Sequence, residues 1–192
     1  FLQLLSSTAT TTRRFVDEIS MAQSGKNACT VLDTRKTQPG LRLAQKYAVR
    51  IGGGKNQRLG LWDGFLFKEN HLKCLGGISE LKNKLEILKK ANKKNSFTSG
   101  NIQIEVENIS ELKIALSMGI TNILLDNFSE SSIIEAVRLN RKQAVLEVSG
   151  GVNFDSLVKF AKRGVDRISI GCLTKDVIAI DFSLQVEKNY NS

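Results

Sequence analysis

The chain has 192 residues, of which 41% are hydrophobic and 24% are charged, as is usual for a globular domain in water. This length can bury one hydrophobic core, so we expect a single domain over residues 1–192. The sequence holds no apolar run as long as a membrane span and no signal-peptide pattern, and its 3 cysteines are scattered. We therefore expect a cytoplasmic protein with reduced thiols, no membrane partner and no structural zinc site.

The basic character of the chain narrows the choice of partners. The 28 basic and 19 acidic residues give a formal net charge of +9, which suits either nucleic acid or an anionic substrate. The densest basic run lies over residues 82–94, near the end of a predicted helix, where lysines complement the helix dipole and face solvent. The sequence has no helix-turn-helix, RNP or zinc-finger pattern, so we expect an anionic small molecule and no nucleic acid.

Predicted helices and short apolar strands alternate along the chain. The periodicity predicts helices over residues 2–21, 40–47, 78–91, 110–117, 130–140 and 154–162. It predicts strands over residues 29–32, 65–67, 102–106, 122–125, 144–148 and 167–170, with 49–51 as a further short candidate. The strands are almost continuously apolar, which is typical of a parallel sheet covered by helices. Repeated βα units favour an α/β barrel, and an open doubly wound sheet is the alternative.

Two blocks of sequence carry cations at predicted strand ends. Residues 31–40 read VLDTRKTQPG, so a buried strand ends at the pair Arg35 and Lys36. Residues 50–61 read RIGGGKNQRLGL, where three glycines allow close backbone approach or positive φ, and Arg58 follows them. Lys68 ends the next apolar run. A loop after a strand can direct such side chains into one cleft.

The two blocks resemble the quinolinate phosphoribosyltransferase family, also called nicotinate-nucleotide pyrophosphorylase. The family pattern is close to DTRKT-x-PG, then GGG-x-NHR-x-GL-x-D, then K-x-NH, and the resemblance extends over residues 1–184. It implies an incomplete TIM-like α/β barrel. It also implies decarboxylating transfer of phosphoribose from phosphoribosyl pyrophosphate to quinolinate. The products are nicotinate mononucleotide, pyrophosphate and CO₂, in a step of NAD synthesis.

The resemblance assigns roles to the cations. Arg35, Arg58 and Lys68 would bind the carboxylates of quinolinate, since an arginine fork suits a planar carboxylate and lysine supplies a point charge. Lys36 matches a catalytic lysine that approaches the phosphoribosyl substrate. Gln57 stands where the family has histidine; it can donate a hydrogen bond to substrate but carries no charge. His71 matches a second family histidine, with a structural role as the alternative.

Acidic residues are expected beside the ribose. Glu105 and Glu107 alternate with apolar residues and so point to one face of their strand, and Asp126 ends the next strand. Glu107 and Asp126 match the family's catalytic acidic pair in the preferred alignment. Glu105 is the second choice for the glutamate of that pair, and we expect it to contact substrate. Carboxylates at a pyrophosphate site suit Mg²⁺, held directly or through water.

Two late glycine turns complete the predicted site. Ser149, Gly150 and Gly151 follow a strand and open a helix, and Gly171 closes the next strand. Backbone amides in such turns bind phosphate, and the last two βα loops of a barrel commonly do so.

The family also carries an amino-terminal sandwich domain, and this sequence begins at the helix that follows it. An arginine of that segment reaches the neighbouring subunit, so we expect a homodimer or higher homo-oligomer and little activity from this stretch alone. A fragment, a split product and a degraded enzyme remain open. One rival is a relative of the molybdenum-operon type, against which residues 68–71 (KENH) argue. The others are an impaired remnant that binds phosphate or a partner, which Gln57 favours, and a basic nucleic-acid module.

Overall fold

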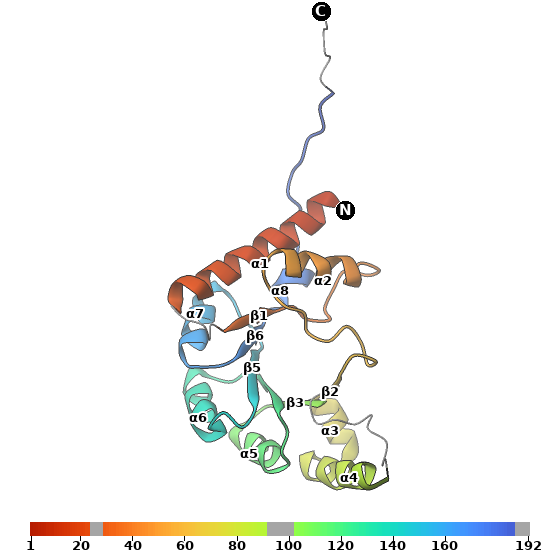
Figure 1. Ribbon diagram of the computed structural model, residues 1–192, viewed down its shortest axis with the longest axis vertical. Helices are drawn as coiled ribbons and strands as arrows, with labels where there is room; N and C mark the ends of the chain where they lie inside the picture. The colour runs from red at the N-terminus through yellow and green to blue at the C-terminus, as the bar shows by residue number, and fades with distance from the viewer. Residues whose placement is uncertain (24–28, 92–101, 187–192) are drawn as a thin grey trace, which may run out of the picture.

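The computed structural model describes residues 1–23, 29–91 and 102–186, and helices and strands alternate along them (Figure 1). The elements are α1 (Leu2–Ala22), β1 (Thr30–Leu32), α2 (Arg42–Ile51), β2 (Phe65–Phe67), α3 (Glu69–Leu75), α4 (Ile78–Ala91), β3 (Ile102–Val106), α5 (Ile109–Ser117), β4 (Asn122–Asp126), α6 (Glu130–Asn140), β5 (Val145–Ser149), α7 (Phe154–Lys162), β6 (Arg167–Ser169) and α8 (Cys172–Lys175).

The six strands form one parallel sheet in the order β1-β6-β5-β4-β3-β2. This order runs round a barrel without the reversal that a doubly wound sheet has in its middle. In the described residues β1 and β2 do not pair with each other, and a single parallel bridge joins Leu32 to Lys55 on the open side. The expected incomplete TIM-like barrel is therefore confirmed, and the doubly wound alternative is wrong.

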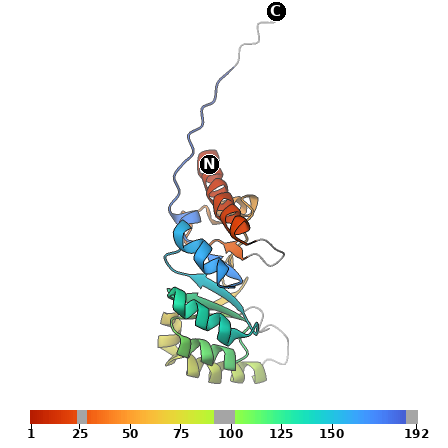
Figure 2. The same cartoon turned by 90° about the vertical axis from the view of Figure 1, so that its left-hand side faces the viewer.

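Helices cover the outer face of the curved sheet (Figure 2). The strands contribute buried residues such as Ile104 and Ile123, and the helices contribute residues such as Leu112 and Ile133, all at 0% exposure. The long helix α1 packs on α2 and α7, with the rings of Phe15 and Phe154 stacked at 3.9 Å between centroids. No helix within the described ranges is long and apolar enough to cross a membrane.

The three successive glycines allow helix α1 to approach the loop after α2. A Cβ on Gly52 would lie 2.4 Å from the Ala9 carbonyl oxygen, and one on Gly54 would lie 2.8 Å from Thr12 Cγ2. Gly53 has φ +88°, as the sequence led us to expect. The close backbone approach at Gly52 and Gly54 is therefore to helix α1 and not to a ligand.

Most predicted elements agree with the structure within two residues, and the exceptions are short or local. The helix expected over 40–47 is α2, which continues to Ile51, so the candidate strand over 49–51 is wrong. Val49 is buried on the same helical face as Gln45, which explains its apolar character. The short helices α3 and α8 were not expected. Part of the lysine run over 82–94 lies outside the described residues.

Candidate active site

A cavity of about 850 Å³ opens at the carboxyl ends of the strands, where α/β barrels place their active sites. The loops after all six strands contribute to its lining. Every site residue predicted from the sequence lines it, namely Arg35, Lys36, Gln57, Arg58, Lys68, Glu105, Glu107, Asp126, Ser149, Gly150, Gly151 and Gly171. The fold therefore brings together residues that are up to 136 positions apart, since Arg35 and Gly171 line the same cavity.

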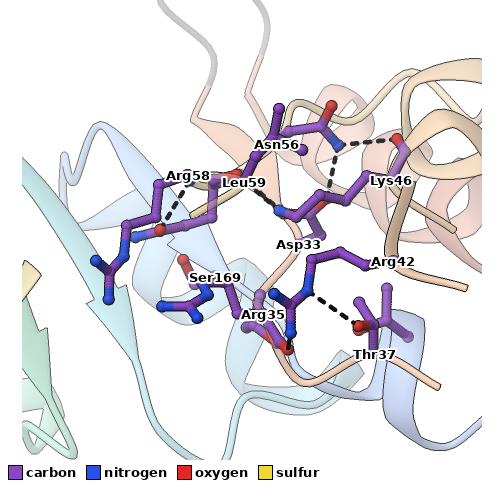
Figure 3. Close-up of polar contacts among 12 residues, drawn as sticks. Asp33, Arg35, Thr37, Arg42, Lys46, Asn56, Arg58, Leu59 and Ser169 are labelled. Atoms are coloured by element: carbon purple, nitrogen blue, oxygen red, sulfur yellow. Dashed lines mark hydrogen bonds and ion pairs between the residues drawn. The ribbon is translucent and has the colours of Figure 1, made fainter. Parts of the chain in front are cut away.

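The buried carboxylate of Asp33 joins the two sequence blocks (Figure 3). Asp33 follows β1 and accepts hydrogen bonds from Lys46 Nζ at 2.5 Å, Asn56 Nδ2 at 2.6 Å and the Gln57 amide at 2.8 Å. Lys46 is only 1% exposed and also donates to the Gln57 carbonyl at 2.6 Å. Burial raises the pKa of Asp33, and hydrogen bonding from Lys46 opposes this. Asp33 thus fixes the backbone that precedes Arg58.

Helices α2 and α8 hold the loop that carries Arg35 and Lys36. The buried Gln45 side chain accepts from the Gln38 amide at 2.8 Å and donates to the Thr174 carbonyl at 2.9 Å. Thr174 Oγ1 in turn donates to the Lys36 carbonyl at 2.7 Å. Because these contacts use backbone atoms of the loop, the Lys36 side chain is left to line the cavity.

Arg35 and Arg58 bring positive charge to one part of the cavity (Figure 3). Arg58 Nη1 donates to the Gly64 carbonyl at 3.0 Å, while its buried Nε has no hydrogen-bond partner among the described residues. Burial, and then repulsion from Arg35, lower the pKa of Arg58. Two adjacent guanidinium groups with donors to spare form a site suited to an anion.

Gln57 lies between this cavity and a smaller one of about 320 Å³ inside the barrel, and it lines both. Its Nε2 atom donates to Gln103 Oε1 at 2.8 Å and to Glu147 Oε1 at 3.1 Å. Its Oε1 atom accepts from the Arg58 amide at 3.0 Å. The hydrogen bonds of the Gln57 side-chain amide among the described residues are therefore all to other protein groups.

Lys68 and Glu105 form an ion pair at 2.7 Å across the cavity wall. Glu105 is 4% exposed, and its burial raises its pKa from 4.5 to about 7 despite the presence of Lys68. The neighbouring Glu69 hydrogen-bonds to Glu105, which lowers the pKa of Glu69. Of these two carboxyl groups, Glu105 therefore has the higher pKa. His71 Nδ1 accepts from the Lys68 amide at 3.0 Å and caps helix α3, which supports the structural alternative for His71.

The two acids of the preferred catalytic pair lie at the rim. Glu107 is exposed just beyond β3, and Asp126 ends β4, where it accepts from Asn127 Nδ2 at 2.9 Å. The charge of Asp126 acts to raise the pKa of Glu105, so these two carboxyl groups are close. Burial and contacts thus favour Glu105, the second choice from the sequence, as the partner of Asp126 across the cavity.

The glycine turn after β5 packs tightly against the turn after β4. Gly150 has φ +97°, and a Cβ there would lie 2.1 Å from Asn127 Oδ1. The Asn127 amide donates to the Ser149 carbonyl at 2.9 Å. Only glycine fits Gly150, because it needs both positive φ and this contact. The turn leads into α7, which Asn153 caps by accepting from the Ser156 amide at 3.0 Å.

Sequence reasoning did not single out the residues that position the cations. Asp33 and Asn56 lie inside the two motif blocks, so their place in the motifs was the available signal. Lys46 and Gln45 gave no such signal, because a polar side chain on a helix is normally exposed, yet both are buried here.

The fold and the cavity together define an α/β-barrel protein whose cavity is lined by both basic and acidic side chains, with Arg35 and Arg58 outside any ion pair of the described residues. The model of the family "Quinolinate phosphoribosyl transferase, C-terminal domain" matches residues 8–185. The chain therefore belongs to this family, and the resemblance read from the two motif blocks is confirmed.

Relatives and solved structures agree with this assignment. The chain is 38% identical over 185 residues to the "Probable nicotinate-nucleotide pyrophosphorylase" of Bacillus subtilis, which covers 96% of this chain and 60% of that protein. It is 36% identical to "Quinolinate phosphoribosyltransferase 1b" of Nicotiana tabacum, covering 97% of this chain and 55% of the relative.

The nicotinate-nucleotide pyrophosphorylase structure from Francisella tularensis superimposes with a TM-score of 0.84 at 46% identity, covering 97% of this chain and 62% of that one. The chain thus spans 55% to 62% of the length of these three proteins.

We expect Asp33→Asn to destabilise the fold by about 3–5 kcal/mol, because it leaves the Lys46 ammonium buried without a counter-charge. Urea unfolding measures the loss. The matched control is Asp17→Asn, whose exposed pair with Arg13 should contribute less than about 1 kcal/mol. The double variant Asp33→Asn/Lys46→Met should recover part of the loss. A cost for Asp33→Asn no greater than that of the control would contradict the buried-pair account.

The stability of the fold should fall as pH rises from 4.5 to about 7, because the folded chain keeps on Glu105 a proton that the unfolded chain has released. In this window the folded state binds more protons, so the slope of the unfolding free energy with pH is negative. Urea unfolding at several pH values should show wild type losing stability relative to Glu105→Gln. A difference between the two proteins that is independent of pH would rule this out.

Proposed function

We propose that this cavity carries out decarboxylating transfer of phosphoribose from phosphoribosyl pyrophosphate to quinolinate. The observation that carries the proposal is the pair Arg35 and Arg58, whose charges are not balanced by any ion pair within the described ranges. They face the same cavity as the glycine turn after β5. A dianionic substrate needs the cationic subsite of the two arginines, and a polyphosphate needs the glycine turn, so the two subsites suit the two substrates together.

Quinolinate has two adjacent carboxylates on a pyridine ring, and the cations support binding of both. Arg35 and Arg58 both line the cavity and would offer planar guanidinium forks to one carboxylate. Lys68 would hold the other carboxylate by leaving Glu105, a step made easier by the proton that Glu105 retains below about pH 7. The planar ring is then held in a fixed orientation.

The glycine turns would hold the phosphates. Gly150 and Gly151 line the cavity with φ +97° and +56°, and successive backbone amides in such a turn are a common phosphate-binding element. Gly171 lies at the neighbouring turn, after β6, and Lys36 borders the same space. These groups provide positive potential without a dedicated arginine for each phosphate.

The carboxylates fit a hydrated Mg²⁺ better than a protein-caged one. No group of three or more acidic, histidine or cysteine side chains in the described residues could enclose a metal. Glu107 and Asp126, at the rim, would hold the ion through one or two carboxylates, directly or through water, as Mg²⁺ prefers. When bound, the ion supplies neutralising charge to the departing pyrophosphate.

The chemistry needs positioning and charge stabilisation. The ring nitrogen of quinolinate forms a bond to the anomeric carbon as the bond to pyrophosphate breaks. The 2-carboxylate then leaves as CO₂, and its electron pair on the ring carbon takes up one proton from solvent. Asp126 and the ionised form of Glu105 would stabilise positive charge that develops on the ribose ring, and the fixed cations orient the acceptor.

We expect Arg58→Ala to weaken quinolinate binding roughly tenfold to a hundredfold, the loss of one charge-assisted contact. Isothermal titration calorimetry with quinolinate measures the affinity. Arg163→Ala is the matched control, because Arg163 is exposed and pairs with Glu130 on the outer helices. Unchanged affinity in folded Arg58→Ala protein would remove Arg58 from the site, and the absence of binding to wild type would refute the proposed function.

We expect Glu105→Gln to lower turnover at least about tenfold and more than Glu107→Gln does, because Glu105 is buried beside Lys68 and Asp126, while the exposed Glu107 would share a hydrated Mg²⁺ with Asp126 and water. Release of nicotinate mononucleotide from quinolinate and phosphoribosyl pyrophosphate with Mg²⁺ measures turnover. If Glu105→Gln lowered turnover only slightly and Glu107→Gln lowered it strongly, Glu107 would be the catalytic glutamate, as the sequence first indicated.

A further inference from the structure

A buried carboxylate that no catalytic role uses lies beneath the cationic site. Glu147 on β5 is 1% exposed and lines only the smaller interior cavity. Its oxygens accept from Gln57 Nε2 at 3.1 Å, from Gln103 Nε2 at 2.9 Å and from Ser169 Oγ. None of the ion pairs found in the described ranges includes Glu147. This acid is therefore satisfied by neutral donors alone.

These contacts fix the orientation of the Gln57 amide. With Nε2 toward the interior, both of its protons meet acceptors, on Gln103 and Glu147, and Oε1 meets the Arg58 amide. The flipped amide would place its oxygen against the Glu147 carboxylate and its protons against the Arg58 N–H. Both of these contacts are repulsive, so only one orientation satisfies the site.

The two donor protons of Gln57 are thus both engaged below the floor of the larger cavity. A substrate carboxylate above that floor accepts hydrogen bonds and cannot donate one, so it needs a donor that Gln57 no longer has free. What Gln57 does offer is its carbonyl oxygen, which holds the backbone of Arg58.

We infer that Gln57 is a positioning residue that anchors Arg58 to the buried Glu147, and that it does not itself bind substrate. Glu147 is held in turn by Gln103 on β3 and Ser169 on β6, so three strands set the position of one substrate-facing guanidinium. For its ligand the inference rests on the proposed function, while the link between Gln57 and Glu147 is independent of any ligand.

The link is tested by unfolding a pair of variants. Gln57→Met keeps the length of the side chain and removes its hydrogen bonds, and Glu147→Gln keeps its volume and removes the charge. Each variant multiplies the unfolding equilibrium constant by a factor. The factor for the double variant should be smaller, by roughly fivefold or more, than the product of the two single-variant factors. Glu130→Gln, on an exposed carboxylate, should combine with Gln57→Met multiplicatively. Multiplicative effects of Gln57→Met and Glu147→Gln would overturn the inference.

The positioning role is tested by calorimetry with two ligands. Gln57→Met and Glu147→Gln should each lower the affinity for quinolinate roughly fivefold to tenfold. The double variant should bind quinolinate no more weakly than the single variant with the larger loss. The affinity for phosphoribosyl pyrophosphate should change less than about twofold, since the proposed phosphate subsite does not include Arg58. A Glu147→Gln variant with normal quinolinate affinity beside a weakened Gln57→Met would mean that Gln57 touches substrate, and would overturn the inference.

An equal loss for both ligands would indicate a general effect on the fold and would also overturn the positioning role. If wild-type protein binds no quinolinate, the proposed function fails, and the unfolding measurement still decides whether Gln57 is tied to Glu147.

Discussion

The site depends on one buried carboxylate, that of Asp33. Strand β1 has only three residues, and on its open side a single bridge at Lys55 takes the place of a full neighbouring strand. Asp33 strengthens this junction by accepting from Lys46, Asn56 and the Gln57 backbone. Arg35 and Arg58 lie on the two segments that the carboxylate joins. Because the barrel is not closed by a continuous ladder, side-chain hydrogen bonds set the spacing of these two cations.

The barrel satisfies its two deepest acids in different ways. Asp33 has the Lys46 ammonium as a partner, so that cluster is close to neutral. Glu147 has only amide and hydroxyl donors among the described residues, from Gln57, Gln103 and Ser169. Asp33 thus holds the backbone before Arg58 directly, and Glu147 acts on Arg58 through the side chain of Gln57.

Features that depend on residue type and order could be predicted from the sequence, and features that depend on burial of polar groups could not. The apolar strands predicted the parallel barrel, and motif positions at strand ends predicted the lining of the cavity. Lys46 and Glu147 were missed because nothing in their neighbourhood distinguishes a buried charged side chain from an exposed one. Gln57 was expected to face substrate from its place in the motif, and only the positions of Gln103 and Glu147, 46 and 90 residues further on, show where its donors go. The glycine run allowed either close backbone approach or positive φ, and the sequence could not show that the approaching segment is α1, because that crossing is a tertiary contact.

The charges of the cavity also indicate how it would distinguish a dianion from a monoanion. Arg35 and Arg58 have no acidic partner in the described residues, so an incoming carboxylate gains their attraction without breaking an ion pair. Lys68 is already paired with Glu105, and a ligand must supply a second negative charge to take its place. The raised pKa of Glu105 lowers the cost of that exchange, because a protonated Glu105 is a weaker competitor for Lys68. A ligand with one carboxylate would occupy the arginines and leave the Lys68 pair intact. Only a ligand with two carboxylates would engage both halves of the site, which is the arrangement of charge that the proposed substrate quinolinate would bring.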